Sequence, residues 1–342
     1  MSRFFRVLLI SLLIAGCSVS EKPPAPVAVE GIAFYSMPWM VKVSALPAGV
    51  TVEAWQADLQ KVLDDANRVL STYQPDTELM RFNAAPVGQW VTVSPMLFRA
   101  VQTAVEVSAL TGGAYDITVG PLVDLWGFGP KAVPEKTPDA AQIAAARTRV
   151  GWQHIGIDAQ KSALMRKADI QLDLSSVGEG VAVDALVAHL QARGLKDFMV
   201  SVAGCTRVSG YKPDGSRWVI AIEQPDGSGR PYQVLALTEQ AISTSGSYRN
   251  YHELEGRRYS HTIDPSTGAP ITHRGVSVSV IAGDGNTTRA DALATALNVM
   301  GPQKGFALAQ RENIPAGFME HAETGLKVQY TQAMRAWLPE KK

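Results

Sequence analysis

Residues 173–184 read Asp-Leu-Ser-Ser-Val-Gly-Glu-Gly-Val-Ala-Val-Asp, and the fold that we expect is inferred first from this segment and its neighbours. The apolar run at 170–174 predicts a strand, the small residues after it predict a turn, and residues 181–194 predict a helix. The amide groups at a helix start can face a phosphate. Asp173 and Glu179 flank this opening, either as helix caps or as groups that bind a ligand.

In the rest of the chain, helical periodicity predicts further helices at 51–71, 94–110, 137–150 and 290–300. Strand-like runs occupy 31–46, 198–202, 218–223, 234–237 and 275–282. Helices and strands mix without a regular βαβ alternation. This pattern favours an α+β fold, a single catalytic domain of mixed sheets with packed helices, over a doubly wound parallel sheet. No Gly-x-Gly-x-x-Gly follows a strand, so the sequence does not support a Rossmann site.

Composition excludes several classes of protein. The chain has 342 residues, 46% of them hydrophobic, and 32 basic side chains balance 32 acidic ones. Zero formal net charge argues against nucleic-acid binding, which needs a basic excess. The apolar fraction and the mixed charge exclude wholesale disorder. Two cysteines cannot build a disulfide framework.

The N-terminus predicts a lipid anchor. Arg3 and Arg6 precede an apolar stretch at 7–15 that is too short to span a bilayer, and Ala15-Gly16-Cys17 follows. This ending resembles the lipobox of bacterial lipoproteins, in which the cysteine is diacylated; the alternative is an ordinary secretory signal with an incidental cysteine. We therefore expect a signal peptide at 1–16, a lipidated Cys17 with a Pro-rich tether at 17–31, and the catalytic domain at 32–342. The expected location is the cell envelope, facing the periplasm, on the inner or the outer membrane.

Two further segments carry candidate site residues. Residues 71–83, STYQPDTELMRFN, predict a turn and a short helix capped by Asp76 or Thr77. In this segment Tyr73 either stacks on a flat ligand or packs beneath the turn. Residues 111–123, TGGAYDITVGPLV, contain a glycine pair that either lets the backbone approach a ligand or simply ends a helix, and the polar groups of Asp116 and Thr118 favour the ligand.

A fourth constellation is split along the chain. It comprises ISTSGSYRN at 242–250, SHTIDPSTG at 260–268 and RADALATA at 289–296. Asp291 and Thr295 share one helix face, and a carboxylate with a hydroxyl and a backbone carbonyl supplies the hard oxygens that Mg²⁺ prefers. Taken alone, the pair is more often a solvated helix face.

In this order, the segments resemble the ApbE family of flavin transferases, over residues 32–340. The family binds FAD and Mg²⁺, splits the pyrophosphate and transfers FMN to a Thr or Ser hydroxyl of a target protein. The resemblance implies targets among subunits of sodium-pumping NADH:quinone reductase or related electron-transport complexes.

Residue roles follow from the resemblance, motif by motif. It implies flavin contacts from Met37, Tyr73, Ala114, Tyr115, Asp116, Asp173, Glu179 and Ile263. It implies metal ligands at the Ser176 carbonyl, Asp291 and Thr295, and it makes His261 and Asp264 the candidate catalytic residues. Many members have Ala-Lys-Gly where this chain has Gly178-Glu179-Gly180, which replaces a cation near the ligand with an anion.

Electrostatics support the metal independently. Asp116, Asp173, Glu179 and Asp291 would repel a diphosphate, so a divalent cation is required between them. His261 is the candidate base because an imidazole titrates near neutral pH, although it could also simply bond the flavin or the backbone. Two alternatives remain at this point: a Mg²⁺-dependent pyrophosphatase that releases FMN and AMP from FAD, and a non-catalytic FAD-binding lipoprotein.

Overall fold

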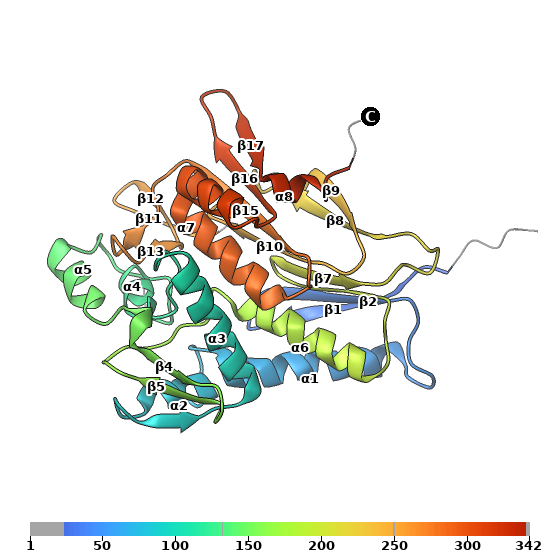
Figure 1. Ribbon diagram of the computed structural model, residues 1–342, viewed down its shortest axis with the longest axis horizontal. Helices are drawn as coiled ribbons and strands as arrows, with labels where there is room; N and C mark the ends of the chain where they lie inside the picture. The colour runs from blue at the N-terminus through green and yellow to red at the C-terminus, as the bar shows by residue number, and fades with distance from the viewer. Residues whose placement is uncertain (1–23, 132, 249, 340–342) are drawn as a thin grey trace, which may run out of the picture.

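A computed structural model describes residues 24–339 except residues 132 and 249. The predicted signal peptide and Cys17 lie outside the described residues. The fold is built on one eight-stranded antiparallel sheet (Figure 1), with strand order β1-β2-β6-β7-β10-β15-β16-β17. Its strands are β1 (Val27–Ala33), β2 (Met37–Val43), β6 (Phe198–Val202), β7 (Cys205–Ser209), β10 (Ala241–Gly246), β15 (Gly275–Ala282), β16 (Ala316–His321) and β17 (Leu326–Tyr330).

Helices cover one face of this sheet. They are α1 (Val52–Leu70), α3 (Pro95–Leu110), α6 (Gly178–Ala192) and α7 (Thr287–Arg311). Leucines and valines of α1 and α6 pack with β1, β2 and β6, whereas α7 packs with β15 and β16, and α3 packs against α7. Burial of these apolar side chains is the main driving force for folding.

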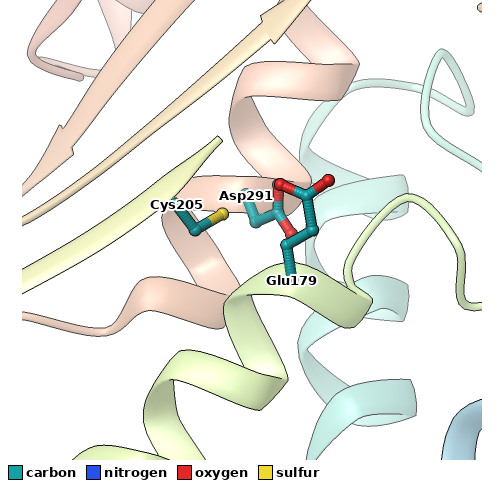
Figure 2. A group of neighbouring side chains, drawn as sticks. All are labelled: Glu179, Cys205 and Asp291. Carbon is teal, nitrogen blue, oxygen red and sulfur yellow. The ribbon is translucent and has the colours of Figure 1, made fainter. Parts of the chain in front are cut away.

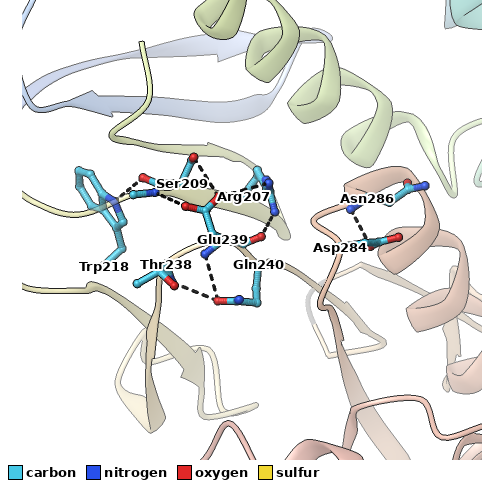
Figure 3. Close-up of polar contacts among 9 residues, drawn as sticks. Arg207, Ser209, Trp218, Thr238, Glu239, Gln240, Asp284 and Asn286 are labelled. Carbon is cyan, nitrogen blue, oxygen red and sulfur yellow. Dashed lines mark hydrogen bonds and ion pairs between the residues drawn. The ribbon is translucent and has the colours of Figure 1, made fainter.

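A hairpin covers the opposite face of the sheet. Its strands are β8 (Trp218–Glu223) and β9 (Pro231–Leu237), and the short helix α8 (Gln332–Arg335) lies beside it (Figure 1). Arg207 on β7 ties the strand ends together (Figure 3): its guanidinium donates to the Glu239 carbonyl, and the Glu239 carboxylate accepts from Ser209 Oγ at 3.1 Å. The side chains of Arg207 and Glu239 thus hold β7 against the turn into β10.

Smaller elements surround the end of the sheet where the site lies. A three-stranded sheet has the order β3 (Trp90–Thr92), β5 (Ala163–Arg166) and β4 (Ile155–Asp158), and α2 (Glu78–Ala84) shares its apolar cluster. In the chain, α4 (Gly120–Leu125), α5 (Ala140–Arg147) and the 3₁₀ helix Trp152–His154 come between α3 and β4. Two hairpins, β11 (Tyr251–Leu254) with β12 (Arg257–Ser260) and β13 (Ile263–Asp264) with β14 (Ala269–Pro270), complete the fold. Trp126 Nε1 donates to the Gly268 carbonyl at 2.9 Å, which holds β13 against α4.

The α+β prediction is confirmed, with local differences. The expected strand at 170–174 is wrong: the segment is extended and buries Ile170, Leu172 and Leu174, but it belongs to no sheet. The expected strand at 31–46 is a hairpin of two strands, and β1 begins at Val27, inside the range expected for the tether. The helix expected at 290–300 starts at Thr287 and continues beyond a break at Gly301, where φ is 75° and Pro302 follows.

Within the part of the chain that is described, we find no helix with both the length and the apolar character needed to cross a membrane.

Candidate active site

A cavity of about 700 Å³ lies where α6, α7 and the ends of several strands meet. Twelve of the residues predicted to contact flavin, bind the metal or act in catalysis line it: Met37, Tyr73, Ala114, Tyr115, Asp116, Asp173, Ser176, Glu179, His261, Ile263, Asp291 and Thr295. These residues come from segments far apart in the chain. Antiparallel pairing of β2 with β6 and packing of α6 on α7 bring them together.

The predicted metal ligands form one corner of the cavity. Asp291 and Thr295 lie one turn apart on α7, and Thr295 Oγ1 is 3.5 Å from the carbonyl oxygen of Ser176. The Ser176 side chain is held in place because its hydroxyl donates to the buried Tyr115 hydroxyl at 3.1 Å. The helix spacing that the sequence offered for Asp291 and Thr295 therefore produces a shared face that points into the cavity, not into bulk solvent.

The fold holds the carboxylate of Asp291 in a fixed orientation. One oxygen accepts from the Gly180 amide at 2.9 Å, and the other accepts from Ser243 Oγ at 3.0 Å. Glycine is required at position 180, because a Cβ there would lie 2.7 Å from the Thr287 carbonyl oxygen. Asp184, one turn further along α6, accepts from the Thr287 and Thr288 amides at 3.1 and 2.9 Å. The two helices are thus locked together at the site.

Glu179 and Cys205 lie beside Asp291, and Figure 2 shows the three side chains converging from α6, β7 and α7. Their ligand atoms all lie within 4.8 Å of one another. Glu179 accepts from the Gly204 amide at 2.8 Å, and the Cys205 thiol donates to Ser243 Oγ at 3.1 Å. Burial raises the pKa of both carboxyl groups and of the thiol, and the charge of Asp291 raises the pKa of Glu179 further.

The residues present fit a hard divalent cation. Asp116, Asp173, Glu179 and Asp291 all line the cavity, and none of its described lining residues is Lys or Arg. Buried carboxylates without a cationic partner are costly. The Ser176 carbonyl, the Asp291 carboxylate and the Thr295 hydroxyl supply oxygen donors of the kind that Mg²⁺ prefers.

Two of the predicted flavin-binding acids also accept hydrogen bonds from the backbone around them. Asp116 accepts from the Thr118 amide at 2.8 Å and from the Trp152 amide at 3.0 Å. Asp173 accepts from the amide and the hydroxyl of Ser175 at 2.8 and 2.6 Å. Burial raises the pKa of both groups. Neither Asp173 nor Glu179 caps α6, whose N-cap is Val177 without a side-chain bond, so the capping alternative is excluded.

The glycine pair ends a helix, and it is not among the residues that line the cavity. Gly112 and Gly113 adopt positive φ just after α3, and their amides donate to carbonyls of the last helical turn. They end the helix and turn the chain so that the next three residues, Ala114, Tyr115 and Asp116, line the cavity. Tyr73, in contrast, is 55% exposed and lines the cavity, as expected for a ring that stacks on a ligand and not for one packed beneath a turn.

The two predicted catalytic residues, His261 and Asp264, lie in different surroundings. His261 lines the cavity, and its Nδ1 lies 3.0 Å from the Asn250 carbonyl oxygen. A carbonyl only accepts, so Nδ1 carries the proton and Nε2 is left with a free lone pair. Burial lowers the pKa of His261, which favours the neutral form. Asp264 is not among the residues that line this cavity; its carboxylate accepts from the amide and hydroxyl of Ser266 at 2.8 and 2.6 Å, and it borders a neighbouring cavity.

Sequence reasoning missed the groups that orient the acids. These are the Gly204 amide, which contacts Glu179, and the Ser243 hydroxyl, which contacts both Asp291 and Cys205. Ser243 stands in a quoted motif, but no spacing rule connects it with α7. Only the pairing of β10 between β7 and β15 places it there.

Comparisons with known proteins agree on one family. The family model described as "ApbE family" matches residues 37–318. The FAD:protein FMN transferase of Klebsiella pneumoniae is 39% identical and covers 98% of this chain and 97% of its own length; that of Vibrio cholerae is 38% identical and covers 92% and 95%. A crystal structure of the Pseudomonas stutzeri flavinyl transferase ApbE, apo form, superimposes with a TM-score of 0.83 at 38% identity and covers 93% of this chain and 98% of that one.

Proposed function

The chain belongs to the ApbE family, and we propose that it cleaves the pyrophosphate of FAD with Mg²⁺, attaches FMN through a phosphoester to a Thr or Ser hydroxyl of a target protein, and releases AMP. FAD:protein FMN transfer itself is the activity by which the relatives compared above are named. The single observation that carries the finer chemistry is the corner formed by Ser176, Asp291 and Thr295 in an acidic cavity.

Binding of FAD is supported by the shape and the lining of the cavity. Its volume, about 700 Å³, is in the range of small-molecule and cofactor sites. Tyr73 offers an exposed ring for a flat heterocycle, while Met37 and Ile263 add apolar surface. The diphosphate would then lie near the acids of α6 and α7.

The metal corner is already organised by the protein's own bonds. Gly180 and Ser243 fix the two oxygens of Asp291, and Tyr115 fixes Ser176. Mg²⁺, when bound at Ser176, Asp291 and Thr295, supplies the positive charge that offsets the phosphates and stabilises the charge developing on the leaving AMP.

His261 is the group that would take the proton of the attacking hydroxyl. Its Nδ1–H is held by the Asn250 carbonyl, so Nε2 is the free acceptor. The lowered pKa keeps the ring neutral near pH 7. The Asp264 carboxylate is engaged by Ser266 outside this cavity, so the role of base falls to His261 alone.

Transfer is tested with the purified protein, FAD, Mg²⁺ and a candidate periplasmic target domain. We expect a target whose mass increases by one FMN, together with an equal amount of AMP. Asp291→Asn preserves size and removes the charge, and we expect a loss of at least about 100-fold. Asp226→Asn, an exposed aspartate in the turn between β8 and β9, is the matched control and should have full activity. FMN and AMP released with an unmodified target would instead indicate a pyrophosphatase, and tight FAD binding without turnover would indicate a binding protein.

The compartment and the targets are part of the same proposal. Lipidation of Cys17 would anchor the enzyme to the inner or outer membrane with its domain in the periplasm. Subunits of sodium-pumping NADH:quinone reductase or of related electron-transport complexes are the targets to test first, because the family resemblance implies them. No nucleic-acid partner is proposed.

A further inference from the structure

The turn between β1 and β2 has an unfavourable backbone. Phe34 and Tyr35 follow one another with φ of 46° and 71°, in the left-handed region that bulky L residues rarely adopt. Turns with consecutive positive φ values favour Asn and Gly, which adopt them at little cost. Two aromatic residues at such a turn therefore need a reason other than turn formation.

For Phe34 the reason is packing, because its side chain packs against the core cluster of β1, β2 and α1. Packing does not explain Tyr35, because its side chain is 67% exposed. Apolar burial on folding therefore does little to offset the backbone cost at position 35. Residues held in such conformations cluster at functional sites.

The ring of Tyr35 lies beside that of Tyr73, a residue that lines the cavity. Its centroid lies 6.4 Å from that of Tyr73, with the planes tilted by 60°, a distance and tilt suited to an aromatic pair. The Gln74 side-chain amide donates to the Tyr35 hydroxyl at 3.0 Å. Tyr73 lines the cavity, as does Met37, two residues after Tyr35.

We propose that Tyr35 is a positioning residue of the FAD site, which holds the ring of Tyr73 at the cavity mouth so that a flat ring system of the dinucleotide can stack on it. This inference rests on the proposed binding of FAD. The Tyr73 hydroxyl also donates a long hydrogen bond to the Phe128 carbonyl oxygen, at 3.5 Å. The hairpin thus keeps a strained residue at its tip because the ligand site requires its ring.

Tyr35→Gly separates this role from a structural one. Glycine relieves the positive φ, so the melting temperature should stay the same or rise. FAD affinity, measured by quenching of flavin fluorescence with Mg²⁺ present, should fall about tenfold, because a Tyr73 ring that is no longer held in place loses its stacking contribution, which is worth roughly that much. Tyr35→Phe keeps the ring and should bind FAD within about twofold of the unmodified protein. Tyr211→Gly, at another exposed tyrosine outside the cavity lining, should leave FAD affinity unchanged.

Separate titrations with FMN and with AMP identify which ring system stacks on Tyr73, because only the affected one loses affinity in Tyr35→Gly. The inference is overturned if Tyr35→Gly binds FAD as tightly as the unmodified protein, or if its loss of affinity merely parallels a loss of stability. Failure of the proposed function looks different. In that case the unmodified protein binds FAD without modifying any target, and the effect of Tyr35→Gly on affinity persists.

Discussion

Gly180→Ala is expected to damage both stability and the metal site, although alanine is the better helix former. A Cβ at this position would lie 2.7 Å from the Thr287 carbonyl oxygen, 2.8 Å from Thr288 Cα and 2.9 Å from Asp291 Cβ. Two of these neighbours are backbone atoms, so helix α7 must shift away from α6. Overpacking of this kind costs up to about 3 kcal/mol, and the gain in helix propensity returns about 1 kcal/mol.

The net loss is therefore about 2 kcal/mol, and in a chain of this size it should lower the melting temperature by about 3 °C. Gly178→Ala is the matched control. It lies in the same helix, and a Cβ there would meet nothing within 4 Å, so this variant should melt at the same or a slightly higher temperature.

The assay is thermal unfolding with and without Mg²⁺ and FAD. The shift of α7 moves Asp291 away from Ser176, so Gly180→Ala should also lose most of the stabilisation that Mg²⁺ and FAD together confer. If the two alanine variants melt alike, or if Gly180→Ala retains the full stabilisation by ligand, then the close helix crossing does not position Asp291.

Three further predictions concern single side chains. The transfer rate should fall as the pH drops below the pKa of His261, which burial places below its ordinary value of 6.5. The pH–rate profile of His261→Gln should lack this acidic fall in rate, and a fall that persists in the variant would assign the base to another residue. Cys205 is fully buried and its pKa is raised, so iodoacetamide should modify it only in denaturant, and rapid labelling of the native protein would contradict the buried position. Cys17→Ser should move the protein from the membrane fraction to the soluble fraction with transfer activity intact, and continued membrane association would exclude the lipid anchor.

Local patterns in the sequence predict those elements whose burial repeats regularly. The helices at 52–70 and 95–110 and the strands at 198–202, 218–223 and 275–282 lie where periodicity places them. Residues 170–174 have the sequence pattern of a strand because alternate side chains enter the core. Alternating apolar residues indicate which side chains are buried, and not whether the backbone pairs with another strand. In the structure, the described backbone of residues 170–174 pairs with no strand.

For the candidate site, too, the sequence predicts one part and cannot predict another. The helix spacing of Asp291 and Thr295 and the quoted motifs are enough to predict which segments converge. They cannot reveal how each polar group is used once the chain has folded. The Asp264 carboxylate accepts bonds from its own loop, and Asp116 accepts from Thr118 nearby and from Trp152, 36 residues away. Asp291 is held by groups more than 40 residues away in sequence. Such partners are set by tertiary packing, which no local pattern records.

Calorimetric titration of FAD into the metal-stripped protein, with and without added Mg²⁺, measures whether the acidic cavity needs the metal to bind a dinucleotide. The acids of the cavity should repel the diphosphate, so FAD should bind at least about tenfold more tightly when Mg²⁺ is present. Riboflavin, which carries no phosphate, should bind equally well in both buffers. Equal FAD affinity with and without the metal would contradict the account.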